Sequence, residues 1–90
     1  MPYQLVLERR FVKNYKKLSK IERKLVDTKL RILADNPWHP SLRTKKIRST
    51  DEFECSVNMD IRIAFFFEDN AIVILLDIGH HDILLGRRTR

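Results

Sequence analysis

The side chains that could carry out chemistry lie mostly in the C-terminal third of the sequence. His80 and His81 follow a glycine in the segment DIGHHDIL, and Arg62 stands in the middle of the strand-like segment MDIRIAFF. Arginine stabilises charge on phosphoryl oxygens, and histidine transfers protons near neutral pH. If these groups converge, they form the set that cleaves a phosphodiester without a metal ion.

Two carboxylates accompany them. Glu54 and Asp82 could each orient an imidazole, and Glu54 could act as a base. Taken singly, each is more often a solvated surface carboxylate. Arg62 likewise has a purely structural alternative, an ion pair across the sheet with Asp77, worth about 0.2–1 kcal/mol.

Positive charge is concentrated in the first half of the chain. Residues 1–50 hold 14 Lys and Arg against 4 Asp and Glu, a net charge of +10, whereas residues 51–90 hold 4 against 8, a net charge of −4. Such a basic half attracts polyanions, nucleic acid first. Lys45, Lys46 and Arg48 are therefore candidates for binding RNA phosphates, although lysines on amphipathic helices are often only a solvated face.

Length and composition favour one small cytoplasmic domain. The chain has 90 residues, and its single cysteine, Cys55, has no partner for an internal disulfide and no zinc-ligand spacing around it. The longest apolar run, from Ala71 to Leu76, is six residues, far below the ~20 that span a membrane. We expect no membrane association, no metal and no cofactor.

The N-terminal half predicts a strand and two helices. Residues 3–7 alternate as a strand does, and from Glu8 the apolar spacing becomes helical. The stripe of this first helix is Phe11, Tyr15 and Leu18. The segment Ser19-Lys20-Ile21-Glu22 matches a capping box, so a second helix begins there, and Asn36-Pro37 ends it.

The C-terminal half predicts strands. Residues 42–47 are typical of a basic edge strand, and three strands follow as a meander over residues 53–57, 61–68 and 72–78. Pairing Cys55 with Ile63 requires a three-residue loop, and a two-residue turn at Asp69-Asn70 pairs Phe67 with Ile72. The order βααββββ is an α+β fold of two layers.

This register fixes which side chains point away from the two helices. Ser56, Arg62 and Asp77 should lie side by side on that face, with the two histidines emerging beside Arg62. The apolar residues of the same face should form an interaction surface that the C-terminal residues cover only in part. Those residues are Phe66, Val73 and Leu75, followed by Ile83, Leu84 and Leu85.

The chain resembles the RelE/ParE toxins of type II toxin–antitoxin systems over nearly its whole length. The resemblance rests on the element order, the segment LRTKKIRSTDEFECSV, the strand MDIRIAFF with its central arginine, and the end DIGHHDIL. It implies one RelE-like domain over residues 1–90 and a metal-independent endoribonuclease that cuts messenger RNA on the ribosome. It also implies a cognate acidic antitoxin as the partner in a hetero-oligomer. A ParE-like poison of DNA gyrase and an inactive basic nucleic-acid-binding module remain alternatives.

Carried over residue by residue, the resemblance places the family's strand arginine on Arg62 and its functional basic residue on His81. Where RelE has catalytic lysines, this chain has Glu54 and Ser56, which implies a histidine-centred variant of the chemistry. His81 would then be the general acid or base, with His80, Glu54 or Asp82 as its counterpart.

The resemblance also implies that the basic segment with Lys45, Lys46 and Arg48 contacts RNA. Many relatives have an aromatic residue a few positions after the histidine, where this chain has Leu84 and Leu85. The apolar surface described above and the basic helices beside it suit an acidic partner. We therefore expect the antitoxin on Phe66, Val73, Leu75, Leu84 and Leu85.

Overall fold

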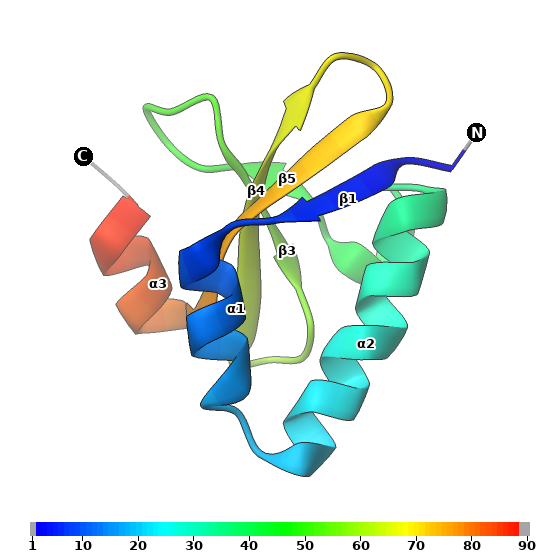
Figure 1. Cartoon of the computed structure of the whole chain (residues 1–90). Helices are drawn as coiled ribbons and strands as arrows, with labels where there is room; N and C mark the ends of the chain where they lie inside the picture. The colour runs from blue at the N-terminus through cyan, green and yellow to red at the C-terminus, as the bar shows by residue number, and fades with distance from the viewer. Residues whose placement is uncertain (1, 89–90) are drawn as a thin grey trace.

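A computed structural model describes residues 2–88, so Met1, Thr89 and Arg90 of the expected domain lie outside the described residues. The elements are β1 (Gln4–Leu7), α1 (Arg9–Lys16), α2 (Lys20–Asp35), the 3₁₀ helix η1 (Pro40–Leu42), β2 (Lys45–Lys46), β3 (Phe53–Ser56), β4 (Ile61–Glu68), β5 (Ile72–His80) and α3 (His81–Arg88) (Figure 1). The α+β prediction is confirmed, and α3 is an addition that the sequence pattern did not predict.

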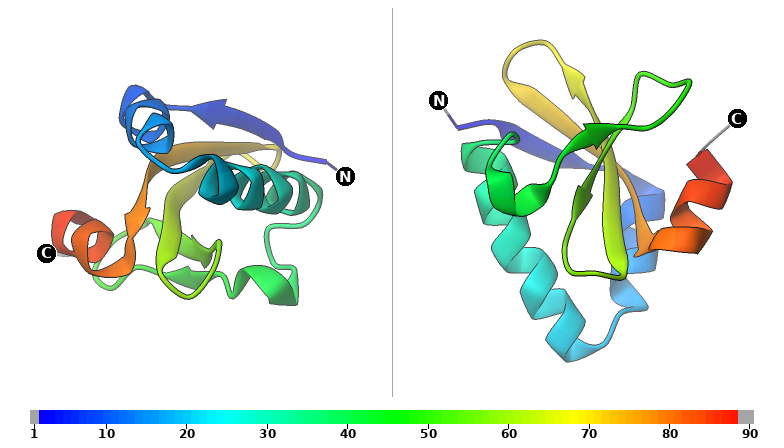
Figure 2. Two further views of the ribbon diagram at one scale, coloured as in Figure 1. Left: turned by 90° about the horizontal axis from the view of Figure 1, so that it is seen from below. Right: turned by 180° about the vertical axis from the view of Figure 1, so that it is seen from behind.

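The strands form one sheet in the order β1-β5-β4-β3-β2. β1 runs parallel to β5, and the other neighbours are antiparallel. The helices α1 and α2 pack together on one side of the sheet, and α3 lies apart from them beside the end of β5 (Figure 2). We call the side under α1 and α2 the helix-side face and the other side the outer face.

The start of α2 shows how the sequence sets local structure. The Glu22 amide donates to Ser19 Oγ at 3.1 Å, and the Ser19 amide donates to Glu22 Oε1 at 2.8 Å. The predicted capping box is therefore confirmed. The hydrogen bond from the Ser19 backbone is the main reason why the pKa of Glu22 lies below its usual value. The helix ends with Asn36 as its C-cap, because the following proline disfavours helical geometry there.

The helix-side face carries the main core. Its buried members come from α1, α2, η1, the strands β3, β4 and β5, and the segments that follow α1 and β3. They are Phe11, Leu18, Val26, Leu33, Leu42, Cys55, Val57, Ile61, Ile63, Phe65, Val73, Leu75 and Ile78. Cys55 lies in this core as predicted, and its burial raises the pKa of the thiol to about 12.

The β3–β4 hairpin has the predicted register, with Cys55 opposite Ile63 and a three-residue loop over residues 58–60. Asn58 holds this loop, because its side-chain oxygen accepts hydrogen bonds from the amides of Asp60 at 2.9 Å and Ile61 at 2.8 Å. The side chain of Arg62 and the amide of His81 both donate hydrogen bonds to carbonyl oxygens of this loop.

The predicted register of the β4–β5 hairpin is wrong. Its turn has three residues, with Asp69 in the left-handed region at φ 61°, so that Glu68 rather than Phe67 lies opposite Ile72. An aspartate tolerates this conformation better than most residues do. One added turn residue shifts the pairing by one position, and a shift of one sends every side chain of β5 to the opposite face.

A β-bulge then restores the expected faces over the second half of β5. The pair Phe65–Leu75 is followed by the pair Ala64–Asp77, which leaves Leu76 as an extra residue in β5. A bulge of this kind reverses the alternation once. Ile78 therefore lies in the helix-side core, as predicted.

The observed register of β5 changes which of its side chains lie on the outer face. Val73 and Leu75 are fully buried in the helix-side core and do not point away from the helices. The side chains that occupy the outer face instead come from alternate positions, Ile72, Ile74 and Leu76.

A second core covers this part of the outer face. Its buried members are Ile47, Ala64, Ile74, Leu76 and Leu84, with Phe66, Ile72 and Leu85 packed against them. Because α3 supplies a fully buried leucine, the apolar outer face is largely internal. The expectation of a broad exposed patch is wrong, and the two-layer description lacks the layer that α3 adds.

The expected edge strand over residues 42–47 is also shorter than predicted. Only Lys45–Lys46 form β2, because Leu42 belongs to η1 and Arg43 takes a left-handed conformation with φ 51°. Leu42 is fully buried, and the burial of its side chain in the helix-side core outweighs the strand pattern.

Candidate functional site

Arg62 lies near the start of β4 on the outer face, opposite Ser56 on β3 and Gly79 on β5. Its Nη1 donates to the carbonyl oxygens of Asn58 at 2.6 Å and Met59 at 3.0 Å. These contacts hold the guanidinium over the loop of residues 58–60, with 16% of the side chain exposed. The predicted position on the outer face is confirmed, and the guanidinium is fixed by backbone carbonyls.

His81 follows β5 directly and is the first residue of α3. Its amide donates to the carbonyl oxygen of Asp60 at 2.6 Å. The ring's Nδ1 is buried and has no hydrogen-bond partner among residues 2–88. The guanidinium of Arg62 and the backbone of His81 therefore meet at the loop of residues 58–60.

Glu54 is the carboxylate that touches the arginine. Its Oε1 lies 3.6 Å from Nε of Arg62, and only 4% of its side chain is exposed. The two residues are diagonal neighbours, since Glu54 lies opposite Ala64. A carboxylate this deeply buried is suited to orient the guanidinium, because substrate would reach it only past Arg62.

His80 and Asp82 flank His81 but lie differently. His80 is the partner of Ile61, whose side chain belongs to the helix-side core. It lines a groove of about 260 Å³ that has residues of α1 and of α3, among them Asn14 and Ile83, in its walls. The expectation that both histidines emerge beside Arg62 is therefore wrong for His80. Asp82 is exposed in the first turn of α3.

The basic segment is divided between the two faces. Lys45 lies opposite Glu54, and Lys46 lies opposite Phe53, so strand alternation sends the two lysines to different sides. Lys46 reaches Asp51, with Nζ 4.0 Å from the carboxylate and both side chains largely in solvent. Arg48 is exposed in the connection between β2 and β3. Of these three, only Lys45 shares its face with Glu54 and Arg62.

The ion pair between Arg62 and Asp77, the structural alternative for Arg62, does not form. Asp77 is fully buried and accepts hydrogen bonds from Asn14 Nδ2 at 2.8 Å, the Ile78 amide at 2.8 Å and Arg87 Nε at 2.9 Å. The three-residue turn and the bulge are the cause, because each shifts the register by one position and together they place Asp77 opposite Ala64 instead of Arg62. Asp77 thus ties α1 and α3 to β5.

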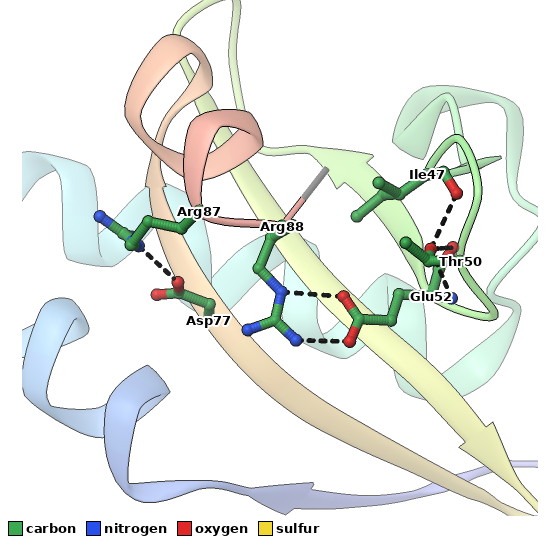
Figure 3. Close-up of polar contacts among 6 residues, drawn as sticks. All are labelled: Ile47, Thr50, Glu52, Asp77, Arg87 and Arg88. Carbon is green, nitrogen blue, oxygen red and sulfur yellow. Dashed lines mark hydrogen bonds and ion pairs between the residues drawn. The ribbon is translucent and has the colours of Figure 1, made fainter. Parts of the chain in front are cut away.

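A second ion pair fastens the end of α3. Arg88 donates from Nε and Nη2 to the two carboxylate oxygens of Glu52 (Figure 3). This bidentate pair raises the pKa of Arg88. Thr50 braces the same loop, since its Oγ1 donates to the Ile47 carbonyl at 2.8 Å. Arg87 extends over β5 toward Asp77, and a Cβ on Gly79 would stand 3.3 Å from its Nη2.

These residues border an open cleft of about 800 Å³ between the connection before β3 and the end of α3. Its lining is Arg10, Ser49, Thr50, Asp51, Glu52, Phe66, Arg87 and Arg88. The sequence analysis did not single out Arg10, Arg87 or Arg88. The run GRR at residues 86–88, after an apolar segment, was the sequence signal for the two C-terminal arginines. Interpreting residues 81–88 as a helix would have placed Arg87 and Arg88 near the outer face.

Residues 2–88 include neither a metal-ligand cluster nor a membrane-spanning helix. No group of three or more His, Cys, Asp or Glu side chains in this range could hold a metal ion. Within the same range, no helix combines the length and the apolar character needed to cross a membrane.

Comparisons with known proteins identify the fold. No family model matches the sequence, and no curated protein does. Among solved structures, RelE of a RelE–RelB complex from Pyrococcus horikoshii superimposes with a TM-score of 0.75 at 18% identity, covering 89% of this chain and 96% of that one. A mutant E. coli RelE toxin in the free state gives a TM-score of 0.75 at 18% identity, covering 99% and 95%. E. coli YafQ gives 0.75 at 15% identity, covering 91% and 97%. The chain therefore has the RelE-like toxin fold, as predicted.

Proposed function

We propose that this protein is the toxin of a type II toxin–antitoxin pair and that it cleaves messenger RNA on the ribosome without a metal ion. The observation that carries the proposal is the convergence of Arg62 and His81 on the loop of residues 58–60. The RelE-like fold supports the same function, and the net charge of +6 suits a protein that binds RNA.

The proposed reaction is an attack by a ribose 2′-hydroxyl on the adjacent phosphate. The new O–P bond forms as the bond to the 5′ oxygen breaks, which yields a 2′,3′-cyclic phosphate and a free 5′-hydroxyl. Arg62 stabilises the charge that builds on the phosphoryl oxygens. Its three hydrogen bonds to the backbone carbonyls of residues 58, 59 and 61 all use Nη1, and Nη2 is the group that we assign to the phosphate.

His81 is the group that we assign to proton transfer, either from the 2′-hydroxyl or to the 5′ oxygen. Asp82, exposed beside it in the first turn of α3, is the candidate counterpart. Glu54 keeps the guanidinium in place from its buried position. His80 faces the helices, and we give it no part in the reaction.

An acidic antitoxin is the proposed partner. The solved structures with this fold include the RelE–RelB complex of Pyrococcus horikoshii, the RelBE2 complex of Mycobacterium tuberculosis and the RelBE complex of E. coli. Val73 and Leu75 are unsuited to direct contact because they are buried, and Leu84 is inside the second core. Phe66 and Leu85 are only partly buried and remain in the proposal. The protein is proposed to act in the cytoplasm, where ribosomes and messages are found.

Expression of the toxin with primer extension on cellular messages tests the function. Discrete cuts that disappear in Arg62→Ala would support it, and the expected loss of rate is about 10²–10³, or 3–4 kcal/mol, as for the removal of one electrostatic donor. Arg31→Ala is the matched control, because it removes one exposed arginine from α2 and should leave the cuts unchanged.

Other outcomes would contradict the proposal. DNA damage without cuts in messages would indicate a gyrase poison of the ParE type. RNA binding with neither cuts nor damage would indicate a binding module without catalytic activity. Full cleavage by a folded Arg62→Ala protein would mean that Arg62 serves only its ion pair and loop contacts.

A further inference from the structure

A small aromatic pocket lies at the end of the sheet away from Arg62. Its rings come from three separate segments: Tyr3 before β1, Trp38 after α2, and Phe67 near the end of β4. Together with Asp69 and Asn70 they line a volume of about 280 Å³. The five steps along β4 from Arg62 to Phe67 span about 16 Å. The aromatic pocket is therefore separate from the candidate site.

The rings are held in place from the inner side. Trp38 stacks on Phe67 with ring centroids 5.9 Å apart and an interplanar angle of 26°, and it meets Phe53 edge-on at 5.5 Å and 89°. Tyr3 lies 6.0 Å from Phe67 at 55°. Trp38 nevertheless leaves 54% of its surface exposed. The indole is fixed by its neighbours on one side and open to a ligand on the other.

The loop that carries Trp38 is also fixed. The Trp38 amide donates to Asn36 Oδ1 at 3.0 Å, and Thr44 Oγ1 donates to the Pro37 carbonyl at 2.6 Å. At the opposite wall, the left-handed conformation of Asp69 at φ 61° shapes the turn between β4 and β5. The pocket is thus formed before any ligand arrives, which lowers the cost of binding.

The charge around the pocket selects the kind of ligand. The faces of aromatic rings carry negative potential, and cations bind over them, over tryptophan best of all. Asp69 adds a carboxylate to the lining, and Glu68 beside it is exposed. From Ile63 to Gly86 the sequence has no lysine or arginine. A nucleotide could stack on Trp38, but these carboxylates would repel its phosphate.

We propose that the aromatic pocket binds a cationic side chain, the guanidinium of an arginine in an exposed basic segment of another protein. The guanidinium would lie over Trp38, and Asp69 would accept its hydrogen bonds. This inference does not depend on the ribonuclease proposal, because none of the residues that form the pocket contributes to the candidate site.

The tryptophan gives a direct measurement. Trp38 is the only tryptophan in the chain, so its fluorescence reports on the pocket. Titration with N-acetyl-arginine amide should change the emission saturably. N-acetyl-citrulline amide, which has nearly the same shape but no charge, should not.

Asp69→Asn tests the carboxylate. Asparagine also accepts left-handed backbone, so this variant keeps the turn and removes only the charge. We expect the affinity for the arginine probe to fall about 1.4- to 5-fold, the fold-change that corresponds to 0.2–1 kcal/mol for an exposed ion pair. Asp51→Asn, which removes an exposed carboxylate outside the pocket, should leave the affinity unchanged.

Three results would overturn the proposal. Equal responses to the arginine and citrulline probes would show that charge is not recognised. The absence of a saturable response to arginine would show that the pocket binds no guanidinium. A saturable response to uridine monophosphate but not to arginine would show that the pocket accepts a nucleobase instead.

Discussion

The two faces of the sheet differ in what their side chains do. On the helix-side face the long strands supply apolar residues to one continuous core. On the outer face, Arg62 and Glu54 lie beside a second, smaller core that α3 covers. Stability is therefore expected to depend mainly on the helix-side face, and activity on the outer face.

Neighbouring residues of the same type make this difference measurable. The chain has like side chains in succession, one on each face, among them the lysines of β2 and the pair Phe65 and Phe66 of β4. The adjacent histidines His80 and His81 end β5 and begin α3. Each pair is a matched experiment, because both members have the same chemistry and nearly the same position in the sequence.

The largest expected effect is at the histidines. His81→Ala should lower the rate of cleavage by about 10²–10⁴, the usual contribution of general acid–base catalysis. His80→Ala should change it far less, because His80 lies opposite Ile61 on the helix-side face. Cleavage of a defined message in a translation extract measures both. Equal losses would show that the sheet does not separate the two side chains.

The phenylalanines should differ in stability. Phe65 is fully buried in the helix-side core, and Phe65→Ala should lower the free energy of unfolding by about 3–5 kcal/mol. Phe66 is only partly buried on the outer face, so Phe66→Ala should cost about 1–2 kcal/mol. Urea denaturation gives both values. A larger loss for Phe66→Ala would make the second core the dominant one.

The lysines should differ in their contribution to RNA binding. Lys45 shares its face with Glu54, whereas Lys46 lies opposite Phe53. Lys45→Ala should lower the slope of log affinity against log salt by about 0.7, the value for one phosphate contact to a single strand. Lys46→Ala should leave the slope unchanged. Identical slopes for all three proteins would show that Lys45 makes no phosphate contact.

The smallest signal is expected at the cysteine. Burial raises the pKa of Cys55 to about 12, so almost no thiolate exists at pH 8 and a thiol reagent should label only the unfolded protein. Ser56→Cys in a Cys55→Ala background places the thiol on the outer face and should react while the protein is folded. Labelling rates with and without urea give the result, and rapid labelling of native Cys55 would contradict the observed register of β3.

The sequence by itself determined the local elements and one hairpin. Ser19 and Glu22 set the start of α2 through hydrogen bonds that need no tertiary contact. The β3–β4 register was also predictable, because Glu54 and Ser56 alternate with Phe53 and Cys55, and alternation fixes register where only one face is apolar. From that register, Arg62 could be placed on the outer face.

Only the tertiary structure decided the rest of the site. Residues 65–67 and 71–76 are apolar at every position, so either face of these strands could have been buried. The three-residue turn at Asp69 and the bulge at Leu76 determine which side chains face the helices. In the resulting register Asp77 does not lie opposite Arg62, and it accepts hydrogen bonds from Asn14 and Arg87 instead. The local sequence pattern could not predict these hydrogen bonds, because the donors to Asp77 come from α1 and α3, which lie far apart in the sequence.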